Sequence, residues 1–263
     1  MNNILVTGAT GGMGKAICKR LAGYGYTVYG LDYREPDTEL SAKFFACDVT
    51  KTESITAVYE EIAKECTHLD AIVHTAGIYD LDSLIEMSEE RFTRIFDINL
   101  FGIYRINKIF KPMLTNGSRI IITSSELAPL DPLPFTGIYG ITKAAVEKYA
   151  FSLRQELNLL GIKVSVIRPG AVKTGLLNVS TVALDRFIEN TRLYNANAQR
   201  FQKIVNSVEA KNVPPEAIAD AVDAALTDKC PKYIYNVNRN PLLRLLDAMP
   251  DHVQVAVIKM ILK

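Results

Sequence analysis

The sequence is poor in the residues that build disulfide frameworks and metal centres. Its 4 cysteines are scattered without a Cys-x-x-Cys pair, and its 3 histidines lie too far apart to suggest ligand spacing. We therefore expect free thiols and no metal site. A strand begins almost at the first residue, leaving no room for a secretory signal, so a cytoplasmic location is the default expectation.

The chain also lacks a strong net charge. Lys and Arg total 30 against 29 Asp and Glu, and no basic run interleaves with aromatic residues, so the composition does not suggest nucleic acid binding. We expect a small-molecule ligand. No internal repeat or linker divides the 263 residues, of which 48% are hydrophobic. This favours one domain, residues 1–263, with a substantial core.

No apolar run suits a bilayer span. The tail, at about residues 241–263, is apolar, but Pro250 interrupts it and it carries several charged side chains, so it is too short and too charged to cross. It could cap a site, pack against another subunit or touch a membrane surface. We expect packing, and contact with a membrane surface is the less favoured alternative.

Short apolar runs alternate with segments of helical periodicity. Strands are expected at residues 4–6, 27–31, 44–47, 69–73, 119–125, 163–167 and 233–237, and helices at 52–66, 83–116, 138–160 and 214–227. This alternation implies right-handed βαβ units in a doubly wound parallel sheet with helices on both faces, an α/β, Rossmann-like fold. Such strands present functional residues at their C-terminal ends.

A glycine-rich turn follows the first strand directly and leads into a helix. Glycines let the backbone approach a pyrophosphate, and the helix N-terminus attracts its charge. A merely tight turn is the alternative, but its position after the first strand favours dinucleotide binding. The predicted contacts in this turn are Gly8, Thr10, Gly11, Gly12, Met13 and Gly14.

An acidic residue, Asp32, ends the second expected strand. There its carboxylate can accept hydrogen bonds from an adenine ribose and would repel a 2′-phosphate, which predicts a preference for NAD(H) over NADP(H). Arg34 could pair with a phosphate and leaves NADP(H) possible. A solvated aspartate opening a turn is the alternative.

Tyr139 and Lys143 stand four apart on one face of the helix expected at 138–160. A phenol is a poor base because its pKa is about 10, but a fixed ammonium favours the phenolate and lowers that pKa. Ser125, at the end of the preceding strand, could hydrogen-bond the same substrate oxygen. The three side chains form a plausible acid/base site for an alcohol or carbonyl.

The same spacing recurs at Tyr104 and Lys108, also on an expected helix. An isolated Tyr-x-x-x-Lys is more often a surface pair, and no strand ending in serine precedes this one. The presence of Ser125 and the glycine-rich turn favours Tyr139 and Lys143 as the functional pair.

Taken together, these motifs resemble the compact one-domain type of the short-chain dehydrogenase/reductase family over nearly the whole chain. The matching pieces are Thr7–Gly8–x–x–x–Gly12–x–Gly14, Asp48–Val49, Ala76–Gly77, Asn99, Ser125, Tyr139–x–x–x–Lys143 and Pro169–Gly170 with Thr174. The resemblance implies a nicotinamide-dependent oxidoreductase. In it Tyr139 is the acid/base, Lys143 binds the nicotinamide ribose and lowers the tyrosine pKa, Ser125 orients the substrate oxygen, and Asn99 holds a relay water.

The resemblance also implies further contacts. Cofactor contacts would come from Asp48, Val49, Ala76, Gly77, Pro169, Gly170, Val172 and Thr174. Residues 175–213, termed the lid below, would close over the substrate, either as a functional lid or as a few irregular helices. Helices 91–116 and 138–160 would form a homodimer or homotetramer.

The lid and the loop after Ser125 are rich in apolar side chains, which predicts an apolar alcohol or ketone of the steroid, retinoid or fatty type. These side chains are Leu127, Leu130, Leu133, Phe135, Leu176, Leu177, Val179, Val182, Leu184, Phe187, Ile188, Leu193, Tyr194 and Phe201.

Two alternatives remain open. Gly8, Gly11 and Gly14 also fit the spacing of the longer sugar-nucleotide epimerase branch, in which a histidine at the place of His74 is common; the short chain and the Pro169–Gly170 turn argue against it. The other alternative is a non-catalytic protein that binds a dinucleotide as a sensor or scaffold.

Overall fold

A computed structural model describes residues 2–209 and 211–263, except the side chains of 175–180 and 207–209. All seven strands run parallel in one sheet, in the order β3-β2-β1-β4-β5-β6-β7. They are β1 Asn3–Thr7, β2 Thr27–Asp32, β3 Lys43–Ala46, β4 Ala71–His74, β5 Arg119–Thr123, β6 Lys163–Pro169 and β7 Ile234–Val237. The predicted doubly wound fold is confirmed, and the strand order reverses between β1 and β4, where such folds bind ligands.

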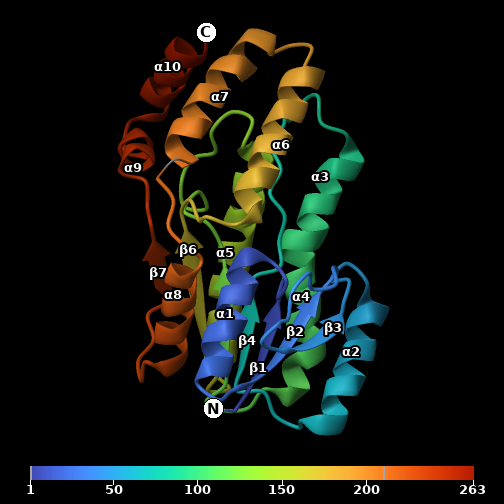
Figure 1. Ribbon diagram of the computed structural model, residues 1–263. Helices are drawn as coiled ribbons and strands as arrows, with labels where there is room; N and C mark the ends of the chain where they lie inside the picture. The colour runs from blue at the N-terminus through green and yellow to red at the C-terminus, as the bar shows by residue number, and fades with distance from the viewer. Residues whose placement is uncertain (1, 210) are drawn as a thin grey trace.

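Helices cover both faces of the sheet (Figure 1). Helices α1 (Gly12–Gly23) and α8 (Glu216–Thr227) pack on one face. On the other face lie α2 (Thr52–Glu65), α4 (Gly102–Phe110) and α5 (Gly137–Asn158). Side chains alternate along a buried strand, so Ile4 and Val6 contact the first group of helices while Leu5 contacts the second.

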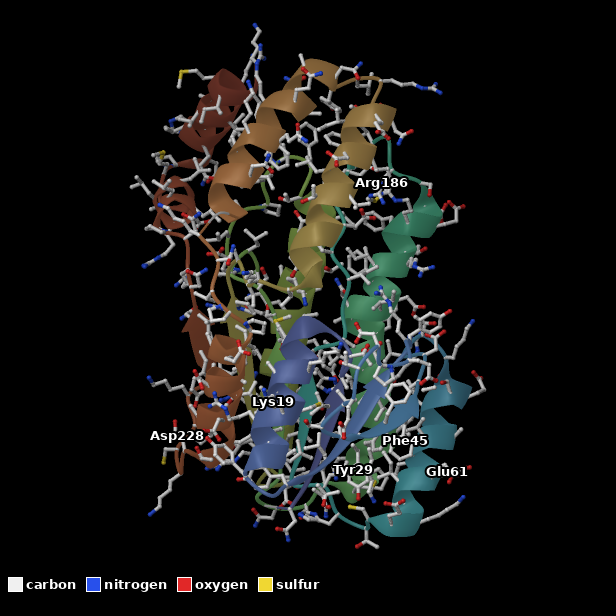
Figure 2. The ribbon with its side chains drawn as sticks, in the orientation of Figure 1. Lys19, Tyr29, Phe45, Glu61, Arg186 and Asp228 are labelled. Atoms are coloured by element: carbon white, nitrogen blue, oxygen red, sulfur yellow. The ribbon has the colours of Figure 1, made fainter. Side chains whose placement is uncertain are left out.

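The segment expected as one helix at 83–116 has different boundaries in the structure. The helix expected at 83–116 begins at α3 (Glu89–Phe96), where Ser88 caps the helix by accepting the N–H of Arg91. A π-helical turn, Asp97–Phe101, joins α3 to α4, and a 3₁₀ turn, Lys111–Met113, ends the segment. At the edge of the sheet the rings of Tyr29 and Phe45, on neighbouring strands, lie 6.3 Å apart (Figure 2).

The lid forms two regular helices, α6 (Gly175–Asn190) and α7 (Asn195–Glu209), which stand beyond the C-terminal ends of the strands (Figure 1). They share a separate apolar cluster, the lid core, whose buried members are Leu81, Phe135, Ala183, Leu184, Phe187, Ala198, Phe201 and Leu262. The sequence allowed for irregular helices in the lid. The structure shows regular ones, whose apolar side chains recur at helical spacing and meet in the lid core.

The tail forms α9 (Pro241–Asp247) and α10 (Asp251–Leu262). Helix α10 packs against α7 (Figure 1), and its Leu262 is buried in the lid core. The tail therefore packs within the chain itself, and the packing against another subunit that the sequence predicts stays a prediction. Among the described residues, no helix combines the length and apolarity needed to cross a membrane.

The histidine that ends β4 is a core residue. His74 is buried, and its Nε2 lies 2.9 Å from Oδ1 of Asn107, whose Nδ2 in turn donates to the Tyr149 hydroxyl at 3.1 Å. Burial lowers the pKa of His74 to about 4, so the ring is neutral and Nε2 carries the proton. The side chain links β4 to α4 and α5.

We expect this histidine to make stability depend on pH. Below pH 6.5 His74 becomes protonated in the unfolded chain, whereas in the folded chain it stays neutral until about pH 4. Between these two values the unfolded state binds more protons, so the stability of the protein falls as the pH falls. The difference between the two pKa values corresponds to a loss of about 3 kcal/mol in the free energy of unfolding. Thermal unfolding between pH 7 and pH 4.5 should show a shallower decline for His74→Gln, which keeps an amide donor, than for the wild type.

The exposed His252 provides the control, since His252→Gln should retain the wild-type pH dependence. Identical pH dependence in His74→Gln and the wild type would contradict this account of the buried histidine.

Candidate functional site

A pocket opens at the C-terminal edge of the sheet. Its empty volume is about 1260 Å³, part of it open to solvent. The ends of β4, β5 and β6 contribute to its floor, helix α5 lines one wall, and α7 and α9 cover it from the lid and tail. Strand ends of a parallel sheet thus deliver residues from distant parts of the sequence into one space.

Ser125, Tyr139 and Lys143 all line this pocket and are nearly buried. Ser125 lies two residues beyond the end of β5, and the other two lie on adjacent turns of α5. The Lys143 Nζ donates to the carbonyl oxygen of Thr123 at 3.1 Å and lies 5.6 Å from the centroid of the Tyr139 ring. The structure therefore brings together the three side chains that the sequence suggested.

Burial sets the acid–base properties of this group. It raises the pKa of Tyr139 to about 12, with the Ser125 hydroxyl acting in the opposite direction. It lowers the pKa of Lys143 to about 8, opposed by the charge of Glu147. The lowering of the tyrosine pKa that the sequence predicts from Lys143 is outweighed here by desolvation, which is the larger effect on Tyr139. At neutral pH Tyr139 is a protonated phenol, able to donate a proton.

The second Tyr-x-x-x-Lys pair has nearly the same local geometry. The Lys108 Nζ lies 5.7 Å from the centroid of the Tyr104 ring, but the ring is 45% exposed on α4 and does not line the pocket. Helical spacing alone produces the cation–ring arrangement. Burial beside Ser125 distinguishes the pair of α5.

Asn99 lies in the π-helical turn, fully buried. Its Oδ1 accepts the N–H of Ile78 at 2.8 Å, and its Nδ2 donates to the Ile78 carbonyl at 3.0 Å. The Nδ2 also lies 3.3 Å from the Thr142 hydroxyl of α5. The side chain is thus engaged in holding the loop after β4, Asn99 does not line the pocket, and the relay water that the resemblance implies stays a prediction.

The glycine-rich turn fits a pyrophosphate. Gly8 has φ of +71°, and a Cβ on Gly14 would overlap the Gly8 carbonyl oxygen, so the turn and the start of α1 are in close contact. Gly11, the residue before α1, makes no side-chain cap, and the first turn carries no acidic residue. The first N–H groups of the helix are thus not competed for by a neighbouring carboxylate.

The other predicted cofactor residues fall into two groups. Met13, Gly77, Pro169, Gly170, Val172 and Thr174 line the pocket. A Cβ on Gly12 would stand 2.7 Å from Cγ2 of Thr174, and one on Gly8 would overlap the backbone of Ala76, so these residues adjoin the turn. Asp48 accepts the N–H and hydroxyl of Thr50, and Val49 contacts Gly102, outside the pocket.

Asp32 ends β2, as predicted. Its Oδ2 accepts the N–H of Thr10 at 3.0 Å and its Oδ1 accepts the N–H of Arg34 at 3.1 Å, which fixes the carboxylate at the edge of the glycine-rich turn. Lys15 of α1, which the sequence did not single out, reaches the same region and forms an ion pair with Asp37.

The apolar residues predicted to meet the substrate divide by location. Leu127, Leu133 and Phe201 line the pocket, whereas Leu184 and Phe187 are buried in the lid core. Phe135, Ile188 and Tyr194 also belong to or pack against the lid core, Leu130 does not line the pocket, and Val182 and Leu193 are exposed. The side chains of Leu176, Leu177 and Val179 lie outside the described residues.

Sequence reasoning missed six apolar or aromatic pocket residues, which are Ile78, Tyr79, Ala171, Ile204, Val205 and Leu243. Two of them were detectable, because Phe201, Ile204 and Val205 follow the spacing of one helix face. Leu243 was not, since only the folded tail brings α9 to the pocket.

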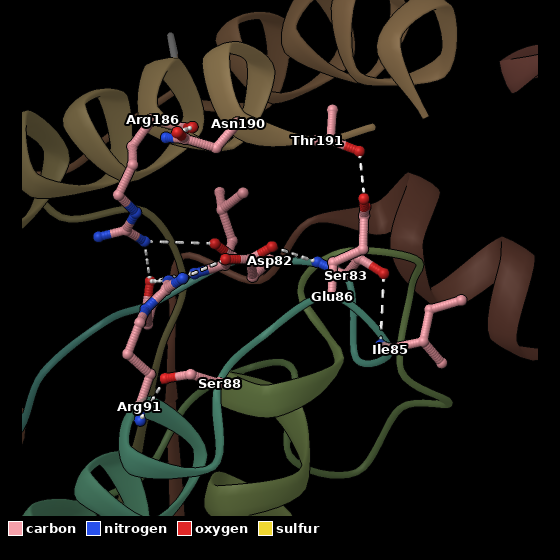
Figure 3. Close-up of polar contacts among 11 residues, drawn as sticks. Asp82, Ser83, Ile85, Glu86, Ser88, Arg91, Arg186, Asn190 and Thr191 are labelled. Atoms are coloured by element: carbon pink, nitrogen blue, oxygen red, sulfur yellow. Dashed lines mark hydrogen bonds and ion pairs between the residues drawn. The ribbon is translucent and has the colours of Figure 1, made fainter. Parts of the chain in front are cut away.

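Polar contacts hold α6 to the loop after β4 (Figure 3). Arg186 of α6, also labelled in Figure 2, forms an ion pair with Asp80, whose carboxylate accepts Arg91 of α3 at 2.9 Å. The hydroxyl of Thr191, the residue after α6, donates a hydrogen bond of 2.7 Å to the Glu86 carboxylate in the same loop. The lid is thereby fixed by residues that do not line the pocket.

Comparison with known proteins identifies relatives over most of the chain. A family model described as short chain dehydrogenase matches residues 2–183. The 3-ketodihydrosphingosine reductase of Bacteroides thetaiotaomicron is 27% identical over 256 residues, 95% of this chain and 94% of that protein. The estradiol 17-beta-dehydrogenase 2 of Rattus norvegicus is 33% identical over 188 residues; the match covers 66% of this chain and 49% of that protein, about half its length.

Solved structures share the fold. A short chain dehydrogenase family protein from Francisella tularensis has a TM-score of 0.74 at 26% identity, covering 90% of this chain and 97% of its own. The ligand-free aldohexose dehydrogenase of Thermoplasma acidophilum has a TM-score of 0.78 at 24% identity, covering 95% and 97%. The 3-ketoacyl-(acyl-carrier-protein) reductase from Brucella melitensis, in complex with NADH, has a TM-score of 0.71 at 20% identity, covering 90% and 96%.

The contact between the turn and α1 generates a prediction. Gly14→Ala places a methyl group against the Gly8 backbone, so we expect a loss of a few kcal/mol in stability and at least about tenfold weaker NADH binding. Gly23→Ala, at the end of the same helix with open space around it, should be neutral or stabilising by up to about 1 kcal/mol. Thermal unfolding and NADH fluorescence titration measure both. Wild-type behaviour of Gly14→Ala would refute the close contact.

Proposed function

Because the chain belongs to the short-chain dehydrogenase family, we propose that it is an NAD(P)-dependent oxidoreductase that interconverts a secondary alcohol and a ketone. The observation that carries this proposal is the meeting of Ser125, Tyr139 and Lys143 in one pocket beside the glycine-rich turn. The matched family favours this function over a sugar-nucleotide epimerase. A non-catalytic sensor would have no need of all three side chains.

When bound, the nicotinamide supplies or accepts the hydride. In the direction of reduction, the protonated Tyr139 donates its phenolic proton to the carbonyl oxygen, to which the Ser125 hydroxyl also donates a hydrogen bond. Lys143, held by the Thr123 carbonyl, lies beside the ring and stabilises the phenolate that remains. Oxidation of the alcohol reverses these steps.

We infer an apolar substrate, of the fatty type rather than a sugar. This inference is supported by six apolar or aromatic side chains of the pocket wall, which are Tyr79, Leu127, Leu133, Phe201, Val205 and Leu243. Two relatives named for 3-ketodihydrosphingosine and for estradiol also support it. Turnover of aldohexoses or nucleotide sugars, with none for any apolar ketone, would rule it out.

We also propose that α4 and α5 form the contact between subunits of a homodimer or homotetramer. Phe101, Tyr104 and Phe151 are large side chains left about half exposed on these helices and the turn before them. Exposed aromatic side chains are enriched at protein–protein interfaces, which supports this proposal.

The first prediction of this proposal concerns the proton donor. Tyr139→Phe removes only the hydroxyl, so kcat for ketone reduction should fall at least about 100-fold while NADH affinity stays within a few-fold. Steady-state kinetics and fluorescence titration check the two quantities.

The matched control is Tyr104→Phe, which makes the same chemical change in the pair outside the pocket. It should retain nearly full activity. Loss of activity in Tyr104→Phe, with a functional Tyr139→Phe, would show that the wrong pair has been assigned.

We propose that NAD(H) is preferred over NADP(H). The Asp32 carboxylate is held at the edge of the turn by two backbone N–H groups and would repel a 2′-phosphate. Lys15 is already paired with Asp37, which supports the same preference. Arg34 is the exposed cation that could oppose it.

Replacing Asp32 by Ser and the exposed Tyr33 by Arg should therefore shift cofactor selectivity toward NADP(H) by at least about tenfold, or about 1.4 kcal/mol. The measurement is the ratio of kcat/KM for the two cofactors with one accepted substrate. A wild-type enzyme that already favours NADPH would show that Arg34 outweighs Asp32.

A further inference from the structure

One buried carboxylate in the pocket has no part in the proposed proton transfer. Glu126 follows Ser125 directly, lines the pocket and is only 7% exposed. Its backbone N–H donates to the carbonyl of Pro169 at 2.8 Å, which fixes the residue between the ends of β5 and β6.

The two carboxylate oxygens of Glu126 have different surroundings. Oε2 accepts the N–H of Asn240, the residue before α9, at 2.6 Å. Oε1 lies 2.9 Å from where a Cβ on Gly170 would stand, and Gly170 itself lines the pocket. No described residue donates a further hydrogen bond to this second oxygen, which leaves it available to a ligand.

The charge of Glu126 is incompletely balanced. In the described part of the chain it forms no ion pair; Arg239 attracts it from beyond ion-pair distance, and Lys143 is bonded to the Thr123 carbonyl. Burial raises the pKa of Glu126, while the Asn240 N–H and Arg239 lower it. A buried carboxylate is costly unless paired, so a cation placed against it would be strongly favoured.

We propose that Glu126 binds a protonated amine of the substrate, which makes the substrate class an amino ketone, or the matching amino alcohol, that bears a long apolar chain. This inference rests on the proposed function. Ser125 and Tyr139 receive the oxygen, and because Glu126 lines the same pocket beside Ser125, it binds an amine that lies within a few bonds of the carbonyl. The apolar walls receive the chain.

A carboxylate–ammonium hydrogen bond out of water is both strong and selective. An uncharged ketone of the same length fills the apolar part of the pocket equally well but leaves the carboxylate without its partner. Glu126 would therefore act as a specificity-determining residue, discriminating between substrates that differ only in the amine.

The competing explanation is structural, because Glu126 also contacts the residue before α9. Asp131 in the same loop makes comparable contacts with the tail: its N–H donates to Asp247 at 3.0 Å, and its Oδ2 accepts Gln254 at 3.2 Å. Asp131 is exposed and does not line the pocket. Asp131→Asn is thus a matched acid-to-amide control for a role in holding the tail.

The test compares kcat/KM for 2-aminododecan-3-one and dodecan-3-one, at a pH where the amine is protonated. The wild type should prefer the amino ketone at least about tenfold. Glu126→Gln keeps an oxygen for the Asn240 N–H but has no charge, so the ratio should fall to about one, while Asp131→Asn should keep the wild-type ratio. Equal kcat/KM for the two ketones in the wild type, or the same loss of ratio in both variants, would overturn the inference.

A binding measurement separates this inference from the proposed function. Calorimetric titration with decylamine and with decan-1-ol requires no turnover. If neither ketone is reduced but decylamine binds more tightly than decan-1-ol, and Glu126→Gln removes the difference, Glu126 is the amine site although the proposed reaction is wrong. If the wild type reduces dodecan-3-one but shows no preference for either amine, the reaction stands and the amine site is refuted.

Discussion

The burial of Lys143 and Tyr139 against the end of β5 is the constraint on which the site depends. The Lys143 ammonium is withdrawn from water and donates to the Thr123 carbonyl at 3.1 Å. Removing a cation from water is expensive, and the large fall of its pKa to about 8 reflects that cost. The packing of α5 against β6 keeps the side chain there, so the core of the fold maintains the burial of this ammonium.

The same burial decides the chemistry. In water the ammonium would favour the phenolate, but in this pocket desolvation of Tyr139 is the larger effect and keeps the phenol protonated. A proton donor suits the reduction of a ketone, and the nearby ammonium becomes useful once the proton has left. Glu126, next in sequence to Ser125, adds a buried carboxylate to the same pocket.

Local sequence patterns were enough to predict many residues of the candidate site. The glycine-rich turn, Asp32, Ser125 and the pair on α5 could be placed because each follows a strand or occupies one helix face, and parallel strands bring such positions together. What could not be predicted depends on partners far apart in sequence. Asp80 meets Arg186 of the lid, and Leu243 reaches the pocket only because the tail folds back.

The sign of the tyrosine pKa shift was also out of reach, for a physical reason. Spacing fixes that Lys143 lies beside Tyr139, but the balance between desolvation and charge depends on how deeply α5 is buried and on where the ammonium points. The exposed pair Tyr104 and Lys108 has almost the same distance between cation and ring, so this distance does not distinguish the two pairs.

The most direct test of the central claim is a pH titration of the phenolate absorbance of the ligand-free protein, taken as the difference between the wild type and Tyr139→Phe. The account predicts no ionisation of Tyr139 up to pH 10, the ordinary pKa of the side chain, because burial raises that pKa to about 12. A phenolate signal from Tyr139 appearing near neutral pH would contradict it, and would show that the charge of Lys143 outweighs desolvation.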